Sequence, residues 1–111
     1  MTAYLDIDQG SDFTVEIDLE NDDGTPMILG GTQIYSQFRK SYSSSTAYSF
    51  VCEILDASNG KFSLSLSGTN SSNIKPGRYL YDVEVVNTTN NAKSRVVEGI
   101  VTINAEITKI P

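Results

Sequence analysis

Apolar and polar residues alternate one by one along most of this chain, and this two-residue period constrains the fold more than any other feature. The clearest case is Phe62, Leu64 and Leu66, which are separated by single serines. Because successive side chains of a β-strand point to opposite faces, the pattern predicts a strand with one buried face. No stretch keeps the 3.6-residue spacing of a core helix over several turns.

Turn residues divide the chain into short alternating runs, spaced roughly ten residues apart. We expect a single helical turn within 69–75, a tail over 107–111, and strands at 3–8, 12–20, 32–40, 47–55, 61–67, 78–87 and 93–104. About seven short strands in 111 residues predict one all-β domain spanning residues 1–111. We expect an antiparallel Ig-like β-sandwich, with a small barrel as the alternative.

The charge and the apolar runs of the chain argue against nucleic-acid binding, a membrane helix and a signal peptide. Its net charge is −6, and eight of the 14 acidic residues but none of the eight basic ones precede Gly30. A nucleic-acid partner requires a basic stripe, so none is expected. No apolar run approaches the roughly 20 residues of a membrane helix. The N-terminus carries no basic region followed by an apolar one, so no signal peptide is visible.

The residue types needed for common catalytic and metal sites are scarce. The chain has no histidine, so Ser-His and Cys-His nucleophile pairs cannot form, and zinc and copper lose their commonest ligand. The lone Cys52 lies between Phe50 and Ile54 on the predicted inner side of its strand, where a small buried side chain is expected. Gly30 and Gly31 do not separate a strand from a long helix, as a phosphate-binding loop would. We expect no enzyme activity and no cofactor.

Acidic residues gather on one side of the predicted strand 12–20 and in the turn after it. They could hold calcium, which binds carboxylate and carbonyl oxygens, but their spacing is not that of the twelve-residue calcium loop. A solvated face that protects a sheet edge from wrong pairing is the other interpretation, and the sequence favours it. The residues are Asp12, Glu16, Asp18, Glu20, Asp22 and Asp23.

The strand 78–87 offers the clearest surface feature. Tyr79 follows the turn at Gly77, which matches the tyrosine corner of Ig-like sandwiches, so a structural role is expected for it. The opposite face of the strand carries apolar residues among charges. If strands 78–87 and 93–104 form a hairpin, four outward aliphatic side chains make an apolar patch rimmed by charge, which is typical of a protein interface. They are Leu80, Val86, Val96 and Ile100.

A second candidate surface contains aromatic and basic residues. Tyr35 and Arg39 share the outer face of the predicted strand 32–40, and Tyr42 follows in a polar loop. Tyrosine rings and a guanidinium group can stack on a sugar or a base. These three residues form a weaker candidate site for ligand stacking.

Four segments, in a fixed order, resemble a known family. They are "GTQIYSQFRKSYSSSTAYSF", "ILDASNGKFSLSLS", "IKPGRYLYDVEVV" and "RVVEGIVTINAEIT". Their order resembles the small Ig-like β-sandwich modules of tailed-bacteriophage virion proteins, in particular the N-terminal domain of phage baseplate upper proteins. The matching positions are Arg39-Lys40, Asp56 with Gly60, Gly77 to Val83, and Glu98 to Ile103.

The resemblance covers nearly the whole chain and implies a structural protein of a phage particle. Its expected location is the virion, after synthesis in the host cytoplasm, and its expected partners are other virion proteins, with several copies in one assembly. Baseplate upper proteins continue into a stalk and a receptor-facing domain, whereas this sequence ends at Pro111. The resemblance therefore implies docking onto neighbouring tail or baseplate subunits. The alternatives are decoration of the capsid head and a carbohydrate-binding adhesive module.

Overall fold

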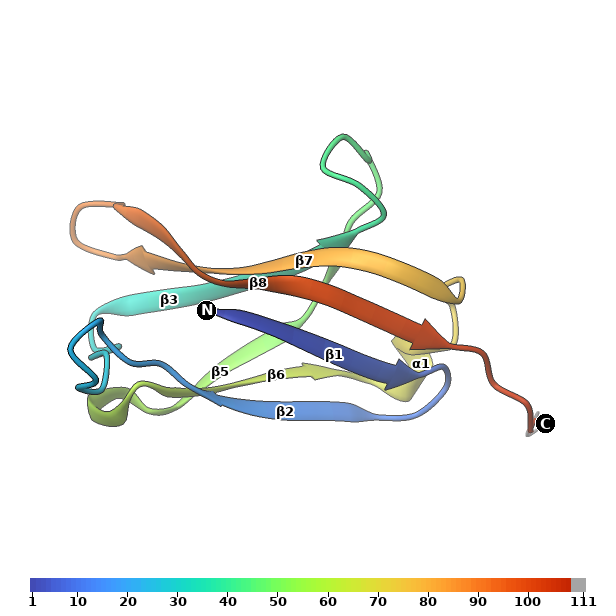
Figure 1. Cartoon of the computed structure of the whole chain (residues 1–111), viewed down its shortest axis with the longest axis horizontal. Coiled ribbons are helices and arrows are strands. Elements are labelled where there is room, and N and C mark those ends of the chain that lie inside the picture. Colours follow the sequence, from blue (N-terminus) through green and yellow to red (C-terminus); the bar gives the residue numbers. More distant parts are fainter. Residues whose placement is uncertain (109–111) are drawn as a thin grey trace.

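The computed structural model describes residues 1–108 as two packed β-sheets (Figure 1). The last three residues of the expected tail lie outside this described part. Two short helical segments, η1 (Ala57–Asn59) and α1 (Gly68–Ser71), interrupt the strands. The strands are β1 (Thr2–Asp8), β2 (Phe13–Asp18), β3 (Thr32–Arg39), β4 (Tyr48–Ser49), β5 (Val51–Asp56), β6 (Lys61–Leu66), β7 (Gly77–Asn87) and β8 (Lys93–Asn104).

The strand order confirms the expected Ig-like sandwich. One sheet has the order β1-β8-β7-β3-β4 and the other the order β2-β6-β5. All neighbouring strands are antiparallel except β1 and β8, which are parallel. This parallel pair departs from the purely antiparallel expectation. β1 runs in the same direction as β8 at the edge of the first sheet, and the chain then crosses to the second sheet as β2.

The predicted strand 47–55 is in fact two strands that belong to different sheets. β4 pairs with β3, and β5 pairs with β6. Phe50 separates them; its side chain is buried, and its backbone N–H donates to the carbonyl of Ser36 at 3.0 Å. Residues 1–108 therefore form eight strands. A continuous alternating pattern could not show that the chain changes sheets at Phe50.

The hydrophobic core lies between the two sheets, where the inward residues of every long strand meet. Phe38 and Phe62 have no exposed surface. Aromatic rings extend the contact at one end of the core, with the centroids of Phe38 and Phe50 5.0 Å apart and those of Phe38 and Tyr79 5.5 Å apart. Such pairs stabilise a core beyond the area they bury.

The tyrosine corner expected at Tyr79 is present. Its hydroxyl donates to the backbone carbonyl of Lys75, four residues upstream, and its ring is 3% exposed. The Lys40 ammonium lies 4.6 Å from the centre of the same ring. Tyr79 therefore fixes the start of β7 and leaves Leu80 on the other side of the strand.

A β-bulge in the pair of β7 and β8 changes which residues of β8 face outward. Val83 lies opposite Val97, and the next residue, Glu84, lies opposite Arg95, so Val96 has no partner across the pair. A bulge of this kind reverses the alternation on one side of it. Val96 therefore packs against the core instead of facing outward as predicted.

Gly99 is the point of closest approach between β1 and β8. A Cβ atom at this position would lie 1.8 Å from the backbone oxygen of Ala3 and 3.1 Å from the ring of Tyr81. The Tyr81 hydroxyl donates to the same oxygen at 2.9 Å. Glycine inside a strand typically marks a bulge or a close backbone approach, and at Gly99 it is a close approach.

Candidate functional site

A half-open hollow of about 790 Å³ lies on the outer face of the five-stranded sheet, which is the face turned away from the three-stranded sheet. β1, β8, β7 and β3 supply its floor. The loop between β3 and β4 rises beside it (Figure 1) and contributes Ser41 and Tyr42. The volume is within the range of small-molecule and cofactor sites.

One row across the floor is apolar. Tyr4 lies opposite Ile100, and Ile100 lies opposite Leu80. Tyr4 is 72% exposed, while Leu80 and Ile100 are half-buried. We call Tyr4, Ile100 and Leu80 the apolar row. Three neighbouring strands thus present a continuous apolar strip to the hollow, which is the arrangement that favours contact with another molecule.

The two rows beside the apolar row are charged: Asp82 lies opposite Glu98, and Arg95 lies one row further along β8. Arg95 donates through Nε to the Asp82 carboxylate at 3.1 Å and through Nη1 to the Glu98 carboxylate at 3.4 Å. The nearby Asp82 carboxylate raises the pKa of Arg95 further above its usual value. One guanidinium offsets one of the two carboxylates, so this part of the floor offers polar contacts and keeps a residual negative charge.

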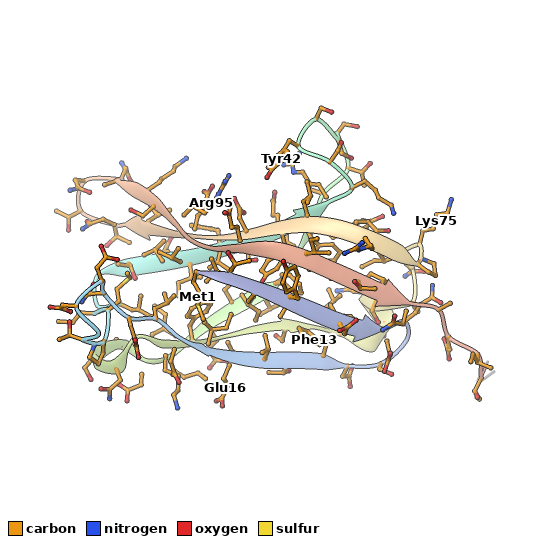
Figure 2. All side chains as sticks on the ribbon, viewed as in Figure 1. Met1, Phe13, Glu16, Tyr42, Lys75 and Arg95 are labelled. Carbon is orange, nitrogen blue, oxygen red and sulfur yellow. The ribbon has the colours of Figure 1, made fainter. Side chains whose placement is uncertain are left out.

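The side of the hollow formed by β3 and its following loop carries two further exposed tyrosines. Arg39 donates from Nη1 to the backbone carbonyl of Ser44 at 2.8 Å, which ties the loop to the end of β3. Tyr42 and Arg95 both lie on the outer side of the five-stranded sheet (Figure 2), and the Tyr42 side chain is 79% exposed. Tyr35 is 54% exposed, and its hydroxyl donates to the Gln33 amide oxygen at 2.6 Å.

The structure therefore unites the two candidate surfaces that the sequence suggested separately. Residues from the proposed partner-binding set and from the proposed stacking set line one hollow: Leu80, Val86, Ile100, Tyr35, Arg39 and Tyr42. Val96 is not among the lining residues, because the bulge directs it toward the core.

Sequence reasoning did not select Tyr4 and Arg95. Tyr4 could have been found from the alternation in β1, since Leu5 and Ile7 point inward and leave residue 4 facing outward. Arg95 could not, because its outward direction depends on the bulge at Val96.

Burial makes the Cys52 thiol and the Tyr81 hydroxyl weaker acids. It raises the pKa of the Cys52 thiol to about 11 and the pKa of the Tyr81 hydroxyl to about 12. A thiol with that pKa is protonated at neutral pH and is a poor nucleophile. Cys52 lies on β5 of the three-stranded sheet and does not line the hollow.

The acidic residues near β2 do not converge. Asp12 accepts a bond from the backbone N–H of Gly68 at 2.6 Å, and Asp23 accepts from the N–H and hydroxyl of Thr25. Those bonds lower the pKa of Asp23. Asp18 lies 4.0 Å from the Lys61 ammonium, and Glu16 points away from the sandwich (Figure 2). Within residues 1–108, no group of three acidic or cysteine side chains is placed to hold a metal ion.

The fold and the hollow together define an Ig-like sandwich domain with a ligand-sized depression on one sheet. No protein-family model matches the chain, and no curated protein matches it. Solved structures that resemble it include InlP of Listeria monocytogenes, with 16% identity and a TM-score of 0.49 over 92% of this chain and 26% of that protein. A family 123 glycoside hydrolase from Clostridium perfringens has 14% identity and a TM-score of 0.43 over 99% of this chain and 24% of that protein.

This chain thus spans about a quarter of the length of each of the two proteins. We infer nothing about function from either likeness. The resemblance to phage virion modules stays a prediction. No helix within residues 1–108 is long and apolar enough to cross a membrane.

Proposed function

We propose that this domain is a non-enzymatic structural module that docks onto a neighbouring protein through the outer face of its five-stranded sheet. The observation that carries the proposal is the apolar row of Tyr4, Ile100 and Leu80, which lies in a hollow beside the paired charges of Arg95. Burying apolar surface provides most of the driving force for association, and a polar surround adds specificity.

The setting that we propose is a bacteriophage particle, in the tail or the baseplate. This part rests on the sequence resemblance alone. The partners would be other virion proteins, with several copies of the chain in one assembly. Decoration of the capsid head would use the same docking surface at a different location.

Immunogold labelling of purified phage particles tests the proposal. An antibody against this chain should place gold on the tail or baseplate. Gold spread evenly over the head would favour head decoration instead. Chain found only in the lysate, with unlabelled particles, would contradict a virion role.

A carbohydrate-binding module is the second candidate, and one observation favours it. Tyr4, Tyr35 and Tyr42 are all more than half exposed around the same hollow, and exposed aromatic rings stack well on the apolar faces of sugars. Calorimetric titration with soluble oligosaccharides tests this candidate. Saturable binding that is lost in Tyr35→Ala and Tyr42→Ala, but kept in Val51→Ala on the other sheet, would support it.

A further inference from the structure

We propose that two copies of this chain pair through the free edges of their β1 strands, in antiparallel orientation and centred on Tyr4. The two five-stranded sheets would join into one sheet of ten strands. The inference rests on the proposed docking role and names one docking partner, which is a second copy of the chain. Adding a strand to a sheet edge is a common mode of protein association.

The backbone of β1 has groups available for this pairing. Met1 accepts from the N–H of Glu98 at 3.0 Å, and Gln9 donates to the carbonyl of Asn104 at 2.9 Å, so the odd-numbered residues of β1 bond to β8. In a parallel ladder the alternate residues point their N–H and C=O groups the other way. The backbone groups of Thr2, Tyr4 and Asp6 therefore face the free edge.

The side chains of β1 suit pairing with themselves. Centring on Tyr4 places the two Tyr4 residues opposite each other and each Thr2 opposite the Asp6 of the second copy. Directly opposed aromatic side chains stabilise a strand pair, and this register opposes no like charges. With two bonds for each of the three hydrogen-bonded pairs, it would form about six backbone hydrogen bonds.

The other sheet edges lack these properties. Antiparallel self-pairing of β2 around Glu16 would oppose two carboxylates, and pairing of β5 around Glu53 would do the same. β5 is also irregular between Ile54 and Asp56, and β4 has only two residues. Bulges, charges and short length are the features by which proteins protect sheet edges. Of the four edges in the described part of the chain, β1 is therefore the one suited to self-pairing.

Several contacts hold β1 against the rest of the domain. The absence of a side chain at Gly99 lets β8 approach Ala3 closely, and the Tyr81 hydroxyl bonds the same backbone oxygen. Leu5 and Ile7 anchor the strand in the core. A pre-ordered edge loses little conformational entropy when it pairs.

Pairing would also enlarge the docking surface. Tyr4 is both the centre of the proposed pair and one end of the apolar row. Two apolar rows would meet end to end and form one strip across the joined sheet. Since the pairing is isologous, it closes as a dimer and leaves both hollows on the same side of the joined sheet.

Sedimentation equilibrium of the purified chain tests the pairing. The monomer mass is 12.1 kDa. As the concentration is raised to hundreds of micromolar, we expect the native chain to approach twice that mass. Thr2→Asp places a carboxylate opposite Asp6 at both ends of the pair and should weaken the dimer at least tenfold. Adding Asp6→Lys to that variant should restore the dimer. Tyr35→Lys, on the same face but away from the edge, should leave the dimer unchanged.

A native chain that stays monomeric, or a dimer that Thr2→Asp does not weaken, would overturn the pairing. A dimer that the added Asp6→Lys does not restore would overturn the register. Circular dichroism of each variant verifies that the fold is intact. These outcomes are separate from the immunogold result, so the docking role and the pairing can fail independently.

Discussion

The outer faces of the two sheets differ in how their apolar side chains are arranged. Both carry apolar side chains at the surface, since Val51 and Leu55 are exposed on the three-stranded sheet. There, however, Glu53 lies between them along β5. On the middle strand, β6, Ser65 lies opposite Val51 and Ser63 lies opposite Glu53. The five-stranded sheet aligns its apolar residues across three strands and places a raised loop beside them. Alignment of apolar residues across strands, together with the hollow, distinguishes the candidate site.

The largest loss of stability in the five-stranded sheet is expected from a substitution at Gly99. Gly99→Ala would place a methyl group within 1.8 Å of the Ala3 backbone oxygen, so β1 must move away from β8. We expect a loss of roughly 3 kcal/mol of unfolding free energy or more, because overpacking against backbone cannot be relieved locally. Urea unfolding measures it. The control is Gly30→Ala, where the nearest atom is 3.9 Å away; equal losses in both variants would contradict the close approach.

Tyr81→Phe should have a smaller effect on the same contact. It removes the hydroxyl that bonds the Ala3 oxygen at 2.9 Å, and a hydrogen bond of this kind contributes about 1 kcal/mol. Urea unfolding at neutral pH should show that loss. No loss would indicate that Tyr81 does not hold β1.

The alkaline stability of the chain should also depend on Tyr81. Burial raises the pKa of Tyr81 to about 12 in the folded protein, above the value of about 10 for an unfolded tyrosine. The neutral hydroxyl therefore stabilises the fold fully below pH 10, and this contribution is lost as the pH rises toward 12. In Tyr81→Phe the fall in stability over that range should be shallower. An unchanged slope would contradict the burial of this hydroxyl.

A pair of substitutions compares the ion pairs on the two faces. Arg95→Ala removes contacts to Asp82 and Glu98, whereas Lys61→Ala removes one contact to Asp18 at 4.0 Å. Solvent-exposed ion pairs contribute little to stability. We expect a slight fall in the thermal midpoint for Arg95→Ala and none for Lys61→Ala. A larger loss from Lys61→Ala would reverse this comparison.

The smallest effect is expected at the turn before β6. Hydrogen bonds from Asn59 and Ser58 lower the pKa of Asp56. The ionised carboxylate therefore stabilises the turn above its unfolded pKa, and the contribution is lost as the pH falls through the folded value. Asp56→Asn should slightly reduce the acid-induced fall in stability. Acid titrations of both proteins, followed by circular dichroism, would show the difference, and identical curves would contradict it.

Alternation and turn residues predicted most of the fold. The expected strand 93–104 matches β8 in full, and 32–40 differs from β3 by one residue. Local patterns could not show features that depend on contacts between distant segments. Phe50 is buried in the core where the chain changes sheets, and β1 runs parallel to a strand almost 100 residues away; neither contact is visible in a local pattern.

The candidate site was predicted in part, for the same reason. Leu80, Ile100, Tyr35 and Arg39 face outward as alternation predicted. The bulge next to Val83 brings Val96, partly buried, against the core and turns Arg95 outward, and a bulge has no local sequence signal here. That the two predicted surfaces form one hollow depends on the pairing of β3 with β7, which the sequence alone did not establish.

The most direct test of the docking face is the recovery of chain variants in purified phage particles. Leu80→Asp with Ile100→Asp introduces two charges into the apolar row, and Val51→Asp with Leu55→Asp introduces two charges on the opposite sheet. If the outer face of the five-stranded sheet docks, the first double variant should be absent from particles, while the second is recovered like the native chain. Equal recovery of both double variants, with intact folds, would contradict the proposed docking face.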